Sequence, residues 1–452
     1  MGVKGLLYLF VLLVASVSLV SYKKGVYLIW LSFLFIPSII LEQWLKFTIP
    51  VMTVLMLGSV ISEMRFSERR LLWKDFFSGK EKGIIAYLFV SLVVIFLSQT
   101  VPVGIQLRGL LNELAMLSFA IQTFMLVKTE EGAVLMLKRF VSCAVVFNVV
   151  YCVIFEIIVG VNPAGLPLYI LLGVDNNDFI TDMIDLERGS LSFRAQTIYR
   201  HSLSLGQYML VFLPLFLKNE KQTVRFVYIV LIAFLIVVSG SRSAMVPMLL
   251  LFLLDMKGSV KSLVPKLLVL VVVCIFAFGF LPSLQQKKII QKVEPFVASL
   301  QFWDDDKQSQ NDISGSTMQM RFDQFDAALV EIEDNPFFGR GYDYRDYYIL
   351  KHNDLHPELL GFESVLLLYL VERGWIGLVF FFLMAYYIYR IFTQELNERR
   401  IIKLVFVGYI TSIIMTGVRP LTLLFVCLVC SIAYGITSKE KEIVPETTDS
   451  QE

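Results

Sequence analysis

Long apolar runs, separated by short polar stretches, make up most of the chain. A helix needs about 20 mostly apolar residues to cross the hydrocarbon core of a bilayer, and by this measure the sequence predicts about 12 or 13 spans. In chain order the expected spans lie at 5–20, 26–41, 47–62, 84–99, 110–127, 140–160, 202–217, 224–240, 244–255, 265–281, 365–391, 402–417 and 421–437. The run at 244–255 is short, and the run at 365–391 is interrupted by Glu372, Arg373 and Gly374. Because backbone polar groups in lipid must be satisfied within each segment, the predicted fold is an all-α polytopic membrane protein.

Lysine and arginine gather in every second connection between the expected spans. These connections are 23–24, 65–82, 128–139, 218–225, 257–266 and 390–400. By the positive-inside rule they are cytoplasmic, so the connections between them face outward. The expected organisation is residues 1–281 with transmembrane helices 1–10 and an outer loop at about 161–200, 282–362 as one large extracytoplasmic loop, 363–438 as the C-terminal transmembrane helices, and 439–452 as a cytoplasmic tail.

Composition agrees with a membrane protein, since 56% of the residues are hydrophobic and only 17% are charged. The formal net charge of +1 gives no reason to expect nucleic acid as a partner. The five cysteines all lie in apolar runs, where they are expected to act as small buried hydrophobes rather than as disulfide or zinc ligands. Cys427 and Cys430 in particular are expected in the core.

Several arginines fall on the side predicted to be outside, against the usual charge bias. Arg194 and Arg200 stand just before an expected span, where a guanidinium beside a helix amino terminus favours an anionic ligand such as phosphate. Arg242 lies in a short polar turn, 239–243, which joins two spans and contains a glycine and three serines. An arginine at the membrane interface also suits simple snorkelling, but the small residues of this turn allow close approach of a ligand to the backbone.

The longest polar interval of the carboxyl-terminal half runs from 321 to 377 and holds two of the three histidines. It opens with Phe322, Phe325, Leu329 and Ile332 at helical spacing, which predicts an amphipathic helix on the outer surface with Arg321 near its start. Asn335-Pro336 ends this helix. The glycines on either side of Arg340 then allow a sharp return of the backbone, although Gly-x-Gly alone is weak evidence of a ligand site.

The order of these motifs resembles the O-antigen polymerase and ligase superfamily, whose members handle lipid-diphosphate-linked glycans outside the bacterial cytoplasmic membrane. The resemblance is carried by Ser-Gly-Ser-Arg-Ser at 239–243, Arg321, Asn-Pro-Phe-Phe-Gly-Arg-Gly at 335–341, and Glu-Arg-Gly-Trp-Ile-Gly at 372–377. It implies a glycosyltransferase C-type fold, undecaprenyl diphosphate as the leaving group, and neither metal nor other cofactor.

The same resemblance suggests roles for individual arginines. Arg242 and Arg321 match arginines that the family assigns to the diphosphate, and Arg194 matches a further one in the outer loop. Arg200 and Arg340 are added as candidates for the same role.

The chain departs from the ligases at the expected catalytic base. Ligases of this kind carry His-Asn, nine residues, and then Gly-x-x-Gly, and the histidine is taken to activate the acceptor hydroxyl. Counting back from Gly374 places Glu363 there, and His352 lies eleven residues too early. Glu363 is therefore the candidate base, with His352 and His356 as alternatives, although an acid at a helix start is also a common stabilising feature.

This departure favours a polymerase that joins undecaprenyl-diphosphate-linked oligosaccharide repeat units into O-antigen, capsular or exopolysaccharide. The first alternative is a ligase that transfers finished polymer to a lipid or protein acceptor. The second is a transporter or flippase, which would concentrate ionisable groups and broken helices at mid-membrane, and the sequence is interpreted as showing neither. The expected partners are lipid-linked donor and acceptor, membrane lipid, a chain-length regulator and a flippase, and the expected location is the bacterial cytoplasmic membrane.

Overall fold

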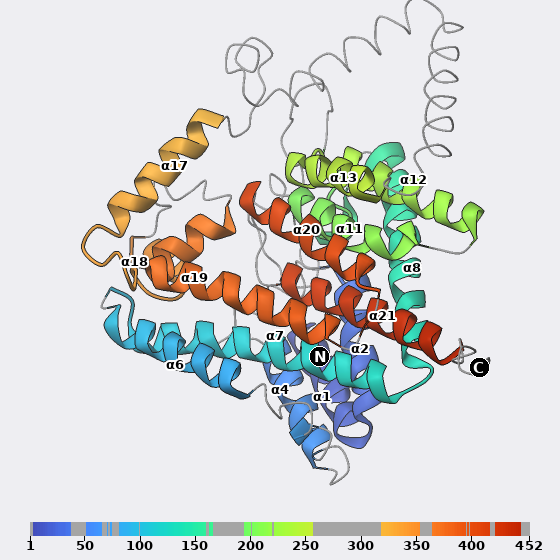
Figure 1. The fold of residues 1–452 in the computed structure, drawn as a ribbon, viewed down its shortest axis with the longest axis horizontal. Coiled ribbons are helices and arrows are strands. Elements are labelled where there is room, and N and C mark those ends of the chain that lie inside the picture. Colours follow the sequence, from blue (N-terminus) through green and yellow to red (C-terminus); the bar gives the residue numbers. More distant parts are fainter. Residues whose placement is uncertain are drawn as a thin grey trace, which may run out of the picture.

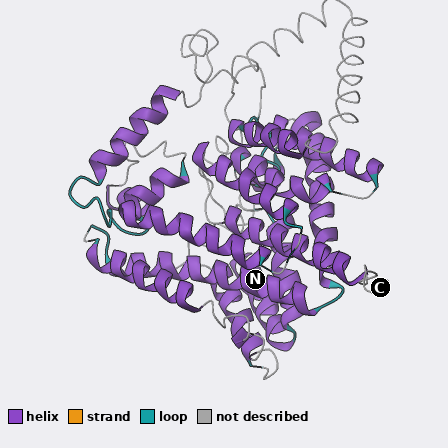
Figure 2. Cartoon of the chain, viewed as in Figure 1, coloured by secondary structure: helices purple, strands orange, loops and turns teal. Residues whose placement is uncertain are grey.

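The computed structural model describes residues 3–37, 51–65, 70, 73–74, 81–98, 100–159, 162–165, 194–199, 201–218, 221–255, 318–352, 364–394, 396, 398–415 and 421–443. Helices make up most of these residues, and no strand occurs among them (Figure 2). The helices labelled in Figure 1 are α1 (Val3–Val20), α2 (Tyr22–Phe35), α4 (Val51–Met64), α6 (Glu81–Leu97), α7 (Val103–Thr129), α8 (Ala133–Tyr151), α11 (Ser202–Leu217), α12 (Gln222–Val238), α13 (Arg242–Asp255), α17 (Met318–Glu331), α18 (Tyr344–His352), α19 (Val365–Thr393), α20 (Arg400–Met415) and α21 (Leu421–Ile443). The predicted all-helical class is confirmed for this part of the chain.

Among the described residues, three helical segments are long and apolar enough to cross a membrane: Val103–Thr129, Ala133–Val159 and Val365–Thr393. The second of these is α8 together with a π-helix, Cys152–Val159, that continues it. Shorter apolar helices occur at Ile85–Leu97, Ser202–Leu217, Gln222–Val238 and Thr422–Ser438. The helical character of these expected spans is therefore confirmed, while the full set of spans and their orientation stay predictions. The expected span at 265–281 lies outside the described residues.

Aromatic side chains fill the main core, where α2, α7, α11 and α21 meet. The ring centroid of Trp30 lies 5.4 Å from that of Phe119 and 5.9 Å from that of Phe425. Trp30 Nε1 donates a hydrogen bond to Thr123 Oγ1 at 3.0 Å. The ring of Tyr208 lies 4.5 Å from that of Phe425 on the other side. Because lipid tails are as apolar as these side chains, the helices are held together by close packing and such hydrogen bonds.

The described cysteines agree with the sequence interpretation except at one position. Cys427 and Cys430 are buried in α21, as expected, and Cys152 is buried as well. Cys143 is exposed on α8, so the expectation of burial was wrong there. An apolar run in a membrane helix has both an inward and a lipid-facing side, and hydropathy does not distinguish them. Cys274 lies outside the described residues.

A smaller group of helices packs against the amino-terminal part of α19. In Figure 1, α17 and α18 lie beside α19, on the side of the molecule away from α12. Their contact is a small apolar cluster whose fully buried members are Val101, Ala328, Ile332, Tyr344, Leu370 and Val371. The polar interval of the sequence is thereby attached to a predicted membrane span.

The buried face of α17 differs from the predicted one. Ile332 is buried and Leu329 is partly buried, as expected, but Phe322 is 56% exposed and Phe325 is 39% exposed. Gln324 and Ala328 are buried instead. Ala328 belongs to the buried cluster shared with α19, whereas the two phenylalanines lie outside it. The predicted helix is therefore present, but the face it buries carries Gln324 and Ala328 rather than Phe322 and Phe325.

Candidate functional site

The turn between α12 and α13 is tight and polar, as the sequence predicts, and its three serines are buried. Gly240 has a φ of +62°, a left-handed conformation that a glycine adopts at little cost. The hydroxyl of Ser239 donates to the Ile236 carbonyl at 2.7 Å and accepts from the Ser241 N–H at 3.3 Å. Ser241 and Ser243 share a hydroxyl–hydroxyl bond of 3.1 Å. These bonds fix the position of the neighbouring Arg242, which begins α13 and is 8% exposed.

Arg194 lies directly against this turn. Its Nε donates to the Ser239 carbonyl at 3.2 Å, and the N–H of Ala195 donates to the Val238 carbonyl at 3.1 Å. A Cβ atom on Gly240 would stand 3.3 Å from Arg194 Nε, so the glycine also provides the space for the arginine. Arg194 is 8% exposed, like Arg242. The structure thus brings two of the predicted diphosphate arginines to one buried turn at the start of a helix, a setting that favours an anion.

A buried carboxylate that the sequence analysis missed holds the segment after Arg194. Glu156 lies on the π-helix and is 5% exposed. Its Oε1 accepts hydrogen bonds of 2.9 Å each from the N–H of Gln196, the N–H of Thr197 and the side-chain amide of Asn162. The available signal was an acidic residue inside an apolar run, which marks a functional candidate in a membrane helix.

The two glycine motifs of the carboxyl-terminal half form a single contact. At Gly374, φ is 61° and ψ is −167°, which breaks α19 in two. The N–H of Arg340 donates to the Val371 carbonyl at 2.8 Å, and the N–H of Gly341 donates to the Glu372 carbonyl at 2.8 Å. In return, the N–H of Trp375 donates to the Pro336 carbonyl at 3.0 Å. The loop at 335–341 therefore satisfies backbone groups that the helix break leaves free.

Both glycines of this contact are required by lack of space. A Cβ atom on Gly374 would lie 2.4 Å from the Phe337 carbonyl carbon, and one on Gly339 would lie 2.5 Å from the Val371 oxygen. Gly339 and Gly341 have φ values of +67° and +118°, which confirms the predicted sharp return of the chain. The interruption noted in the predicted span at 365–391 is thus a real break in the helix.

Beside the break, Arg373 is sandwiched between two tyrosine rings. Its guanidinium carbon lies 3.9 Å from the ring centroid of Tyr342 and 4.1 Å from that of Tyr369. Its Nη1 donates to Glu113 Oε1 at 3.2 Å, and the same oxygen accepts from the Tyr369 hydroxyl at 3.0 Å. This pair ties α7 to α19 inside the protein.

The Arg373 pair and the broken helix bear on the transporter alternative. An ion pair and a helix break do occur within two of the predicted spans. However, the charges of Arg373 and Glu113 are paired with each other. The cavity beside them, which is lined by Tyr87, Ser91 and Arg373 among others, has room for about one water molecule. In the described part of the chain, this cavity is too small for a transported sugar.

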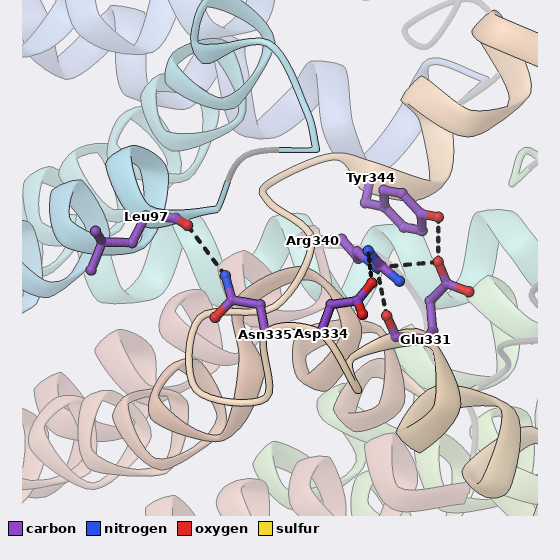
Figure 3. A network of polar contacts seen from close by, with 6 residues as sticks. All are labelled: Leu97, Glu331, Asp334, Asn335, Arg340 and Tyr344. Carbon is purple, nitrogen blue, oxygen red and sulfur yellow. Dashed lines mark hydrogen bonds and ion pairs between the residues drawn. The ribbon is translucent and has the colours of Figure 1, made fainter.

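Arg340 lies at the carboxyl end of α17, within the network shown in Figure 3. Its Nε donates to the Glu331 carbonyl at 2.5 Å, and its Nη1 lies 3.2 Å from Asp334 Oδ2. The Glu331 carboxylate also accepts from the Tyr344 hydroxyl, and burial together with this carboxylate raises the pKa of Tyr344. Arg340 thus ties the loop to α17, and its role toward the diphosphate stays a prediction.

The other predicted site residues are less fully placed. His352 is the last residue of α18, is exposed, and stacks on Tyr348 with ring centroids 4.3 Å apart. Arg321 lies in the first turns of α17, and its side chain is outside the described part. Arg200, His356 and Glu363 lie outside the described residues.

The chain is thus a helical protein with helices long enough to span a membrane, and it places two buried arginines at one polar turn. Residues 227–382, about a third of the chain, match the family described as O-antigen ligase. No curated protein gives a significant match. The matched segment includes Arg242 and both glycine motifs. The resemblance to the O-antigen polymerase and ligase superfamily is thereby confirmed over this segment, and the match supports a function of that general type.

Proposed function

We propose that the protein polymerises undecaprenyl-diphosphate-linked oligosaccharide repeat units on the outer face of the bacterial cytoplasmic membrane. The observation that carries the proposal is the placement of Arg194 and Arg242 at one buried turn. A buried guanidinium is poorly hydrated and interacts strongly with phosphate oxygens. The arrangement therefore suits a substrate that carries a diphosphate.

The chemistry assigned to the site is a glycosyl transfer. A hydroxyl oxygen of the acceptor sugar forms a bond to the anomeric carbon of the donor, and the bond from that carbon to the diphosphate oxygen breaks. The diphosphate gains negative charge as it leaves, and fixed guanidinium groups stabilise that charge without needing to reorganise. The hydroxyl proton passes to a base, for which Glu363 is proposed.

The position of Glu363 supports a polymerase over a ligase, since it replaces the histidine expected in ligases of this type. The ligase alternative is kept because the matching family is described as O-antigen ligase. In that alternative His352 or His356 takes the proton, and the exposed position of His352 at the end of α18 leaves it accessible. The transporter alternative has no comparable support.

Lysine substitutions at the two arginines test the proposal. Arg194→Lys and Arg242→Lys keep the charge but remove the planar fork that binds two phosphate oxygens at once. We expect polymer formation to fall about a hundredfold, the order of magnitude typical when one fixed hydrogen-bond donor that stabilises developing negative charge is lost from an active site. The assay is the yield of polymer from lipid-linked repeat units by each purified variant.

Arg225→Lys is the matched control. Arg225 lies at the opposite end of α12 and pairs with Asp255 at 2.8 Å, a contact that lysine can also make. We expect this variant to retain its activity. Near-native yield from both Arg194→Lys and Arg242→Lys, with normal membrane insertion, would contradict the proposed site.

A further inference from the structure

The segment 194–199 has no helix or strand to satisfy its backbone groups. In a buried position, such groups need other partners. One carboxylate oxygen, Glu156 Oε1, accepts from the N–H of both Gln196 and Thr197. Hydrogen bonds to a carboxylate are short and strong, so this single side chain fixes two successive peptide groups.

Thr197 shows how firmly the segment is held. Its φ is 53°, which is a clear outlier for a β-branched residue. Its hydroxyl donates to Asn148 Oδ1 at 2.5 Å, and its carbonyl accepts from Asn162 Nδ2 at 2.8 Å. Backbone strain of this kind persists only where surrounding contacts enforce it, and it is typical of functional sites.

The same network reaches back to the helix that carries it. Asn162 Oδ1 accepts from the Tyr151 hydroxyl at 2.8 Å and from the N–H of Ala164 at 2.9 Å. Glu156 and Asn148 both belong to α8 and its π-helical continuation. Single turns of π-helix are frequent at functional sites, and here the turn places a carboxylate against the 194–199 segment.

Arg194 binds the α12–α13 turn directly, and the chain connects it to the peptide groups that Glu156 holds. Only two residues separate Arg194 from Thr197, so a shift of the fixed peptide groups moves the arginine as well. Three hydrogen bonds on one oxygen make Glu156 Oε1 a fixed acceptor, which suits an anchor for this segment.

We infer that Glu156 is a positioning residue for the diphosphate site, holding Arg194 against the turn that precedes Arg242. This inference rests on the proposed function, because it assumes that Arg194 contacts the diphosphate. Glu156 itself acts through the backbone of Gln196 and Thr197 and through Asn162, which also binds the Thr197 carbonyl.

The test is a double-mutant cycle between Glu156→Ala and Arg194→Lys, measured as kcat/KM for polymer formation. We expect Glu156→Ala to lose about tenfold to a hundredfold, since a small displacement of a binding group has effects of this size. The double variant should have about the same kcat/KM as Arg194→Lys alone. Once Arg194 has lost its contribution to catalysis, displacing it through Glu156→Ala has little further effect. Glu156→Gln keeps an acceptor oxygen and should recover most of the activity.

Losses that multiply in the double variant would overturn the inference and leave Glu156 a structural residue. If Glu156→Ala fails to insert, Asn148→Ala gives a second test. It removes the bond from the Thr197 hydroxyl, together with the bond that Asn148 donates to the Ala144 carbonyl within α8, and should show a smaller loss with the same non-additivity. Full activity of Glu156→Ala beside an inactive Arg194→Lys would refute the inference alone. Full activity of both Arg194→Lys and Arg242→Lys would instead refute the proposed function at this site.

Discussion

Replacing Gly374 by alanine tests the contact that joins the polar interval to the membrane helices. The backbone at this position has φ 61° and ψ −167°, a region essentially restricted to glycine, and any other residue is strained there by about 1–3 kcal/mol. The new Cβ would also lie 2.4 Å from the carbonyl carbon and oxygen of Phe337. These are backbone atoms, so they cannot rotate away and the loop at 335–341 must move.

Moving that loop breaks the hydrogen bonds from Trp375 N–H to the Pro336 carbonyl and from Ile376 N–H to the Phe337 carbonyl. Each contributes about 0.5–1.5 kcal/mol. Strain and lost bonds together give a destabilisation on the order of 3 kcal/mol or more. We expect polymer formation to fall as well, since Arg340 lies in the displaced loop.

The assay is the free energy of unfolding of the purified protein in detergent, compared with Gly104→Ala. Gly104 lies in α7 and a Cβ there would meet nothing within 4 Å. Alanine at this position should be neutral or stabilise by up to about 1 kcal/mol, because it favours the helix. Equal free energies of unfolding for Gly374→Ala and Gly104→Ala would contradict the described break in α19 at Gly374 and its contact with the loop at 335–341.

Two further predictions concern the titrating groups of the polar interval. Burial and the Glu331 carboxylate raise the pKa of Tyr344 in the folded protein. The tyrosine therefore ionises first in the unfolded chain, and the protein should lose stability as the pH rises above about 10. Tyr344→Phe should weaken that loss in unfolding curves measured between about pH 8 and 11. An unchanged alkaline slope in Tyr344→Phe would contradict the Tyr344–Glu331 contact. Glu363→Gln should abolish polymer formation while lipid-linked substrate still binds, and the double variant His352→Ala/His356→Ala should stay active. The reverse outcome would favour the ligase alternative.

Local features of the site could be predicted from the sequence because they depend on nearby residues. A glycine among serines predicts the turn before Arg242, and it is found at Gly240 with a positive φ. Paired glycines predict the sharp return around Arg340, and both have positive φ. Their association with Gly374 could not be predicted, because it is a tertiary contact between segments more than thirty residues apart.

The inward faces of helices were harder to predict for a reason particular to membrane proteins. Core and lipid are both apolar, so hydrophobic periodicity does not tell one from the other. The stripe of phenylalanines on α17 was therefore expected to be buried, whereas Gln324 and Ala328 are buried instead. Glu156 was missed because it is one acid in an otherwise apolar run, where an averaged hydropathy conceals it.

The most direct test of the central claim is the product formed by the purified protein from lipid-linked repeat units alone. A polymerase uses one repeat unit as donor and another as acceptor, so the account predicts a ladder of products that differ by one repeat. The yield of the ladder should fall about a hundredfold with Arg242→Lys and should be unchanged with Arg225→Lys. No ladder from wild-type protein, together with transfer of preformed polymer to a separate lipid or protein acceptor, would contradict the polymerase assignment.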